Sequence, residues 1–92
     1  MISLEYYTGK DCGVCIVLKP KLFGAVEEQF KDISIQTIQI EKEPEYAAKN
    51  MVFTLPVVIV KLDGKEQFRF AKSFGVSQVT DKLTRLQDAM VS

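Results

Sequence analysis

The chain has 92 residues, and its twelve basic and twelve acidic side chains cancel, so it offers no excess positive charge for a phosphate backbone. No run approaches the ~20 apolar residues of a membrane span, and the residues after Met1 lack the basic start and unbroken apolar stretch of a secretory signal. We therefore expect a single domain over residues 1–92, a soluble cytoplasmic monomer, and neither nucleic acid nor membrane as a partner.

The first forty residues predict a strand, a helix and a second strand. Residues 2–8 are apolar and aromatic and end at a glycine, which is typical of a strand. Pro20 lies inside the helical pattern that follows and predicts a kink; the alternative is a helix that stops and restarts. Residues 33–40 are rich in isoleucine and predict a second strand, parallel to the first because a helix connects them. The helix is expected to bury one face, formed by Cys15, Leu18, Leu22, Val26 and Phe30.

The next thirty residues predict a short helix and a β-hairpin. Acidic residues flank Pro44, a pattern typical of a helix start, and this helix should continue to about Asn50. Pro56 precedes the strongest β run in the chain, residues 57–60. Asp63-Gly64 then gives a two-residue hairpin signal, so residues 66–71 should pair back antiparallel and form an edge strand.

The last predicted element is a helix capped by Ser77. Its buried stripe is expected at helical spacing and consists of Val79, Leu83, Leu86 and Met90. Three phenylalanines near the hairpin are expected to pack under this helix rather than to form a ligand surface: Phe68, Phe70 and Phe74. The elements together predict a mixed α/β sandwich, parallel in its first half and antiparallel in its second.

Cys12 and Cys15 are the only cysteines, and their three-residue spacing suits a dithiol that cycles to a disulfide. A structural zinc ion normally takes four ligands, and one chain without histidine or further cysteines cannot supply them, so we expect no metal. Two alternatives remain open: a metal held with carboxylates or a second chain, and two inert buried cysteines. Gly13, with Lys10 and Asp11 nearby, indicates a solvent-reachable turn and favours redox chemistry.

The spacing of four landmarks resembles the thioredoxin family. These are the cysteine pair after the first strand, Pro20 five residues beyond it, Pro56 before the hairpin, and Gly64 in the hairpin turn. The resemblance covers nearly the whole chain and implies a three-layer α/β sandwich, with a mixed four-stranded sheet and helices on both faces. The resemblance does not include the leading strand and helix of longer thioredoxins. A glutaredoxin is less similar, since its Gly-Gly signature is missing near Gly64.

Several positions depart from the thioredoxin pattern. Asp11 stands where the family usually has tryptophan, and Val14 replaces the proline between the cysteines. Tyr6 aligns with a buried aspartate, and Thr37 with the lysine that accompanies it. The resemblance therefore supports the fold more strongly than it supports the cysteine reactivity that is usual in the family.

The resemblance implies catalytic roles for both cysteines. Cys12, at a helix N-terminus, is expected to be the nucleophile, and Cys15 the resolving thiol. Lys10 should lower the pKa of Cys12 and Asp11 should raise it. A tyrosine is a poor base at neutral pH, and Glu5, next to Tyr6, should face the other side of the strand. Deprotonation of Cys15 is accordingly assigned to water, Glu41 or Lys42.

The resemblance also implies a client-binding surface and a function. Pro56 should have a cis bond from Leu55 and face the cysteines, and the substrate-binding residues are expected to be Thr54, Leu55, Pro56 and Ile40. We expect a thiol–disulfide oxidoreductase that reduces disulfide-containing client proteins in the cytoplasm without a cofactor. Its electrons would come from a thioredoxin-reductase-like or thiol donor. The alternatives are a catalytically weak binding module that uses the Leu55-Pro56 surface, and a metal or cluster held between two chains.

Overall fold

A mixed sheet forms the middle layer of the molecule. The computed structural model describes residues 1–91, and within them the strands β1 (Ile2–Thr8), β2 (Ser34–Gln39), β3 (Val57–Leu62) and β4 (Lys65–Ala71) lie in the order β2-β1-β3-β4. β1 pairs in parallel with β2 and antiparallel with β3, and β4 pairs antiparallel with β3. The predicted parallel pair, antiparallel hairpin and edge position of β4 are confirmed.

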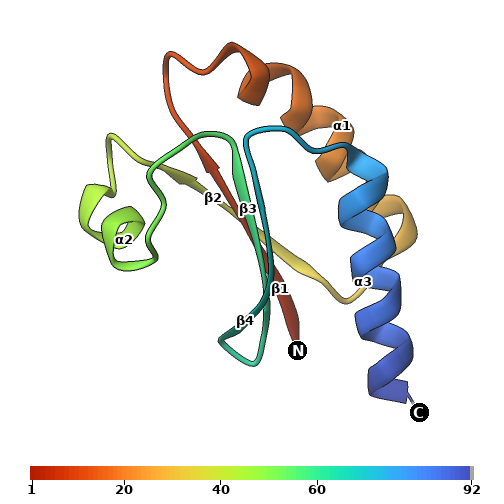
Figure 1. Cartoon of the computed structure of the whole chain (residues 1–92). Coiled ribbons are helices and arrows are strands. Elements are labelled where there is room, and N and C mark those ends of the chain that lie inside the picture. The colour runs from red at the N-terminus through yellow and green to blue at the C-terminus, as the bar shows by residue number, and fades with distance from the viewer. Residues whose placement is uncertain (92) are drawn as a thin grey trace.

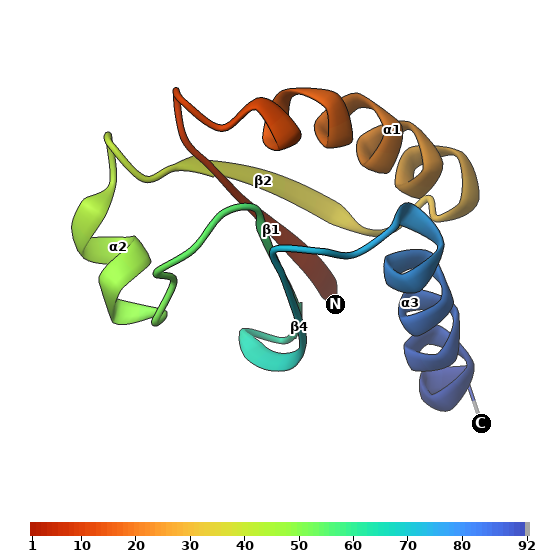
Figure 2. The same cartoon turned by 45° about the horizontal axis from the view of Figure 1, so that its top comes forward.

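Helices cover both faces of this sheet (Figure 1). α1 (Gly13–Gln29) and α3 (Val76–Val91) lie on one face and α2 (Pro44–Lys49) on the other, as the turned view in Figure 2 also shows. Side chains alternate between the faces along β1, so Tyr6 packs with α1 and α3 while Tyr7 packs with α2. The predicted three-layer sandwich, with helices on both faces, is confirmed.

The central strands are apolar because both of their faces are covered. All four residues of the Val57-Val58-Ile59-Val60 run are at most 1% exposed, so this run is buried on both sides of the sheet. The three phenylalanines predicted to pack under the last helix are partly buried against the core that contains Val79 and Leu83. The buried centre of the sheet sets the positions of the ends of β1 and β3. The two cysteines follow β1.

Most element ends differ from the predicted ones by one or two residues, and the two longer helices show the differences clearly. α1 begins at Gly13 with Cys12 as its N-cap, and it passes through Pro20 without a break, so the alternative of a helix that stops and restarts is wrong. α3 begins at Val76, before Ser77, so Ser77 does not cap it. The Gln78 side chain instead accepts a hydrogen bond from the Gly75 backbone N–H at 2.7 Å, the return contact of a capping box.

Met90 is 50% exposed, so its predicted place in the buried stripe of α3 is wrong. Val79 and Leu83 are fully buried, and Leu86 is partly buried. The reason is visible in Figures 1 and 2, where α3 diverges from the sheet toward its C-terminal end. The helical period of the sequence therefore continues beyond the part of the sheet that could cover it.

A polar cluster lies inside the α2 face of the sheet. Glu5 is 5% exposed, and its carboxylate accepts hydrogen bonds from the hydroxyl groups of Tyr7, at 2.8 Å, and Tyr46. The Lys61 ammonium lies 3.2 Å from the same carboxylate and over the Tyr46 ring. Glu5 thus faces the opposite side of β1 from Tyr6, as predicted, and its charge is paired and hydrogen-bonded as burial requires.

Candidate active site at the end of β1

The two cysteines lie where β1 ends and α1 begins. They form a disulfide with a Cα–Cα distance of 5.2 Å. Cys12 has an extended backbone and caps α1: its Sγ accepts a hydrogen bond from the Cys15 N–H at 3.2 Å. In the reduced protein, this N–H group and the positive end of the helix dipole favour a thiolate at Cys12.

The two sulfur-bearing residues differ in access. Cys15 is 1% exposed and belongs to the core between the sheet and the helices, whereas Cys12 is only partly buried against it. An incoming disulfide can therefore reach Cys12 directly. Cys15 is placed to react with a sulfur already attached to Cys12.

Tyr6 lies beneath the cysteines and is fully buried. Its hydroxyl donates a hydrogen bond to the carbonyl oxygen of Cys15 at 3.0 Å, and its ring packs edge-on against Phe23 at 5.5 Å between centroids. Burial raises the pKa of the Tyr6 phenol above its ordinary value. The phenol is therefore a hydrogen-bond donor that holds the first turn of α1, and it is an even weaker base than a free tyrosine.

A hollow of about 400 Å³ opens beside Cys12. Its lining includes two carboxylates, Asp11 from the loop before α1 and Glu41 from the segment after β2, together with Gly9, Cys12, Gly13, Val14 and Leu55. Glu41 accepts a hydrogen bond from the Lys10 backbone N–H at 3.2 Å. Of the two residues considered from the sequence as bases, Glu41 lines this hollow, whereas Lys42 does not belong to its lining.

Gly9 allows the three segments of the site to approach one another. A Cβ atom at this position would lie 2.8 Å from the Cδ1 atom of Leu55 and 3.0 Å from the Oε2 atom of Glu41. Both distances are shorter than ordinary contacts between carbon and its neighbours. A side chain at residue 9 would therefore force the ends of the Leu55 and Glu41 side chains to shift.

The residues predicted to bind clients are only partly brought together. The Leu55–Pro56 peptide bond is cis, as the resemblance implied, and Leu55 lines the hollow beside Cys12. Pro56 is buried, and Thr54 is partly buried outside this lining. Ile40 packs toward the α2 side, and its backbone N–H donates to the Thr8 carbonyl at 3.0 Å.

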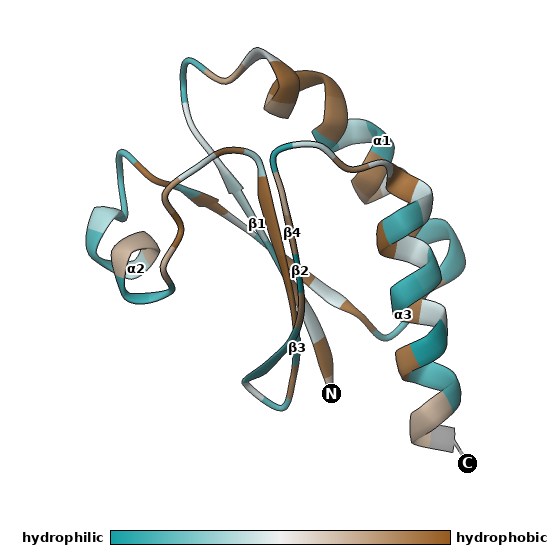
Figure 3. Cartoon of the chain, in the orientation of Figure 1, coloured by the Kyte–Doolittle hydropathy of each residue, from teal (hydrophilic) through white to brown (hydrophobic). Residues whose placement is uncertain are grey.

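Exposed apolar side chains lie on the first turns of α1 and on the loop before Leu55, and the sequence interpretation did not predict their exposure. Val14, Ile16 and Val17 are each more than half exposed on the first turns of α1, and Phe53 is 79% exposed on the loop before Leu55. Figure 3 shows the apolar colouring of the start of α1. The signal was present in the sequence, because these three helix residues lie outside the buried stripe of Cys15, Leu18 and Leu22.

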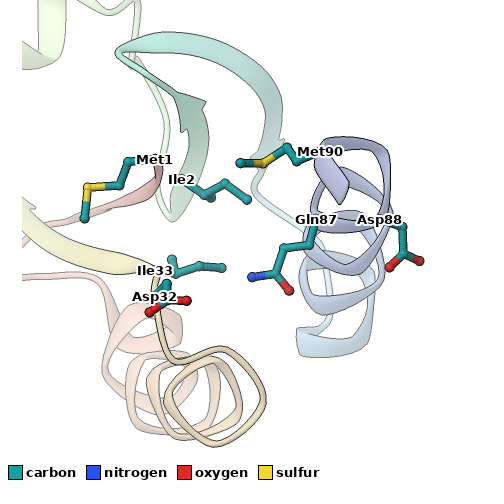
Figure 4. Close-up of a pocket in the computed structure, with 7 residues that line it drawn as sticks. All are labelled: Met1, Ile2, Asp32, Ile33, Gln87, Asp88 and Met90. Atoms are coloured by element: carbon teal, nitrogen blue, oxygen red, sulfur yellow. The ribbon is translucent and has the colours of Figure 1, made fainter. Parts of the chain in front are cut away.

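A second hollow, of about 610 Å³, lies near the other end of β1. Ile2, Ile33, Gln87 and Met90 are among its lining, and Figure 4 shows Ile2 and Met90 pointing toward each other across it. The cysteines are not part of it. Within residues 1–91, no three carboxylate or cysteine side chains gather as a metal-binding group, and no helix has the length and apolar character needed to cross a membrane.

The site and the fold can be compared with those of known proteins. No family model matches the chain. The thioredoxin-like protein YdfQ of Bacillus subtilis is 33% identical over 84 residues, which cover 91% of this chain and 74% of that protein. The structure of thioredoxin 1 from Thermosipho africanus superposes with a TM-score of 0.90 at 31% identity, covering 98% of this chain and 99% of that one. Fasciola hepatica thioredoxin, at 24% identity and a TM-score of 0.82 over 91% of this chain and 79% of that one, shares the fold.

Proposed function

This chain belongs to the thioredoxin-like family, whose fold and paired cysteines support thiol–disulfide redox chemistry, and we propose that here the pair reduces the disulfides of client proteins. The observation that carries the proposal is the different placement of the two cysteines. Cys12 is a partly exposed helix cap with a backbone N–H directed at its sulfur, and Cys15 is buried behind it.

The reaction proceeds in two exchanges. The Cys12 thiolate attacks one sulfur of a client disulfide; a Cys12–client bond forms, the client disulfide breaks, and one client thiolate leaves. The Cys15 thiolate then attacks the Cys12 sulfur; the Cys12–Cys15 disulfide forms and the second client thiolate leaves. Two electrons pass from the protein dithiol to the client, and the client thiolates take up two protons.

The proton of Cys15 needs an acceptor before the second exchange. Tyr6 does not serve, because its hydroxyl is committed to the Cys15 carbonyl and burial raises its pKa. Glu41, which lines the hollow beside Cys12, or water entering that hollow takes this proton. We expect this step to be slower than in a thioredoxin with a buried carboxylate under the cysteines.

Clients are held next to Cys12 by the loop before β3. Leu55 forms one wall of the hollow, and the buried cis Pro56 fixes the backbone that presents it. An extended client segment placed along this loop can pair with its main chain, as in other cases of β-strand addition. Thr54, which precedes Leu55, and Ile40, which precedes Glu41, lie outside the lining of the hollow and would contact a client only beyond it.

A trapping experiment tests the proposal. With Cys15→Ser, the second exchange is impossible, so the protein should accumulate as a mixed disulfide on Cys12, visible as a mass increase that dithiothreitol removes. Cys12→Ser is the matched control and should form no such adduct, because Cys15 is buried. The wild type should also accelerate insulin reduction by dithiothreitol; no acceleration, with client capture intact in Cys12→Ser, would indicate a binding module that uses Leu55 and Pro56.

The direction of electron flow follows from the reduction potential. A reductase in a reducing compartment such as the cytoplasm should have a potential near that of thioredoxin, about −270 mV, and a thiol or a thioredoxin-reductase-like protein would return its electrons. Titration against glutathione measures this potential. A value above about −180 mV would contradict a reductase role.

A further inference from the structure

The hollow beside Cys12 has an acidic lining. Asp11 and Glu41 line it from two separate segments, and no lysine or arginine belongs to the lining. We propose that these two carboxylates select client disulfides flanked by lysine or arginine and disfavour disulfides flanked by carboxylates, including glutathione disulfide. This inference rests on the proposed reductase function and identifies the class of substrate that the same site takes.

Glu41 is exposed, and one hydrogen bond restrains its carboxylate. Its Oε2 atom accepts the Lys10 backbone N–H at 3.2 Å and would lie only 3.0 Å from a Cβ atom on Gly9. The glycine thus lets the carboxylate lie against the backbone of the loop that carries Cys12. A fixed carboxylate interacts with a bound cation at a smaller entropic cost than a mobile one.

The shape of the hollow suits a long basic side chain. Its volume, about 400 Å³, leaves room for one lysine or arginine, and Val14 and Leu55 supply apolar walls for the methylene stem. A client in an extended conformation rises about 3.3 Å per residue, so side chains one or two positions from its cysteine reach the hollow while its sulfur meets Cys12. The two carboxylates would then face the ammonium or guanidinium group.

The remaining charges near the site do not cancel this selection. Lys10 and Lys42 are exposed neighbours of Asp11 and Glu41 in the sequence, and their side chains lie outside the lining of the hollow. The whole chain has a formal net charge of +0, so long-range attraction does not choose among clients. Discrimination comes from the groups near the client cysteine, because charges farther away than the Debye length of about 10 Å at 0.1 M salt are screened.

The test compares two substrates that carry opposite charges beside the cysteine. Two short peptides, each a disulfide-linked dimer, carry either lysine or glutamate on both sides of the cysteine, and the rate constant for reaction with the reduced protein is measured for each. Dithiothreitol is the reference, because dividing by its rates removes the effect of flanking charge on the disulfide itself. Wild type should prefer the lysine peptide by about threefold to tenfold at low ionic strength, the range expected for two exposed ion pairs. The preference should approach unity in about 1 M salt, where the Debye length is ~3 Å.

Variants assign the effect to the two carboxylates. Asp11→Asn with Glu41→Gln should bring the ratio close to one, and because the ratio compares two substrates of the same thiolate, a change in the Cys12 pKa cancels. Glu43→Gln with Glu45→Gln removes the same number of charges from exposed positions outside the lining and should leave the ratio at the wild-type value.

Each outcome bears on one of the two proposals. Equal rates for the two peptides in the wild type, or a ratio that falls as far in the Glu43/Glu45 control, would overturn the selection by Asp11 and Glu41 while reductase function stands. Failure of the protein to reduce either peptide would overturn the reductase function itself. The salt series uses only the wild type, so the inference remains testable even if a variant does not fold.

Discussion

The hydroxyl group of Tyr6 donates a hydrogen bond to the main-chain carbonyl of Cys15 at 3.0 Å. This contact joins β1, a central strand, to the first turn of the helix that carries the dithiol. It takes the place that the resemblance assigns to a buried carboxylate, so a proton acceptor is replaced by a neutral donor whose pKa burial raises. The Tyr6 hydroxyl therefore fixes the first turn of α1 and supplies no carboxylate to accept a proton.

Tyr6→Phe should lower the free energy of unfolding by about 1 kcal/mol, because it removes one buried hydrogen bond and leaves the ring contact with Phe23 intact. Urea denaturation of the oxidised protein measures this. The pH profile for resolution of a Cys12 mixed disulfide should keep its shape, since Tyr6 is not the base. A variant that lost one limb of that profile would show that the phenol takes part in proton transfer.

Arg69 on the edge strand holds the segment that leads to the loop proposed to bind clients. Its guanidinium donates to the carbonyl oxygens of Asn50 at 2.7 Å and Met51 at 3.0 Å, and also to the Glu66 carboxylate. Met51 has a φ of 58°, which residues other than glycine rarely adopt, so this segment depends on contacts from outside it. The anchor therefore connects β4 to the position of Leu55.

Arg69→Met should remove these contacts and lower the free energy of unfolding by about 1 kcal/mol, a modest figure because the group is partly exposed. Amide hydrogen exchange should become faster in residues 50–55, and capture of a client on Cys15→Ser should weaken. Glu66→Gln is the control, because it leaves the guanidinium on both carbonyl groups. Equal exchange in the two variants would show that the carbonyl contacts do not hold the loop.

Two glycines should respond to alanine with opposite signs. Gly24 lies on the exposed side of α1 with open space where a Cβ would be, so Gly24→Ala should raise the free energy of unfolding by about 0.5–1 kcal/mol. Gly64 has a φ of +86° in the hairpin turn, so Gly64→Ala should lower it by about 1 kcal/mol or more. Thermal or urea unfolding measures both. A stabilising Gly64→Ala would indicate that the turn changes its type.

The sequence predicted local features well, because each depends on neighbouring residues. The apolar and aromatic character of residues 2–8, with the glycine that follows them, identified β1 with its observed ends, and Asp63-Gly64 identified the hairpin turn. The site required contacts across the sheet, which no local pattern reports. The Lys10–Glu41 hydrogen bond joins residues 31 positions apart, so Glu41 was recognised only as a possible base and not as a wall of the hollow.

Helix ends and surface contacts were predicted less well for a similar reason. Ser77 is a residue type typical of an N-cap, but α3 begins before it, at Val76. The Gln78 side chain accepts a hydrogen bond from the Gly75 N–H at this helix start. Met90 continues the helical period of α3, but its exposure depends on where the sheet ends. Periodicity reports which face of a helix is apolar and says nothing about how far its partner extends.

The buried ion pair of Glu5 and Lys61 predicts how the stability of the fold changes at alkaline pH. Burial by itself would lower the pKa of Lys61, but the hydrogen bond and negative charge of Glu5, with a smaller contribution from Tyr46, raise it overall. The pKa of Tyr7 is raised by burial and then by Glu5, and that of Tyr46 by its hydrogen bond to Glu5 and then by burial. All three groups thus keep their protons to higher pH in the folded state than in the unfolded state.

A raised pKa contributes stability that is present below the unfolded-state value and is lost as pH rises through the folded-state value, so the wild type should lose stability above about pH 10. Glu5→Gln removes the charge that holds these protons and should make the decline above pH 10 shallower. It should also lower the free energy of unfolding near pH 7 by about 2 kcal/mol, less than for a fully buried pair because the Lys61 side chain is 15% exposed.

Urea denaturation across this pH range measures both effects, with the disulfide kept oxidised so that the cysteines do not titrate. Glu43→Gln, at an exposed position, should follow the wild-type curve, and a Glu5→Gln curve parallel to it would mean that Glu5 does not govern the alkaline transition.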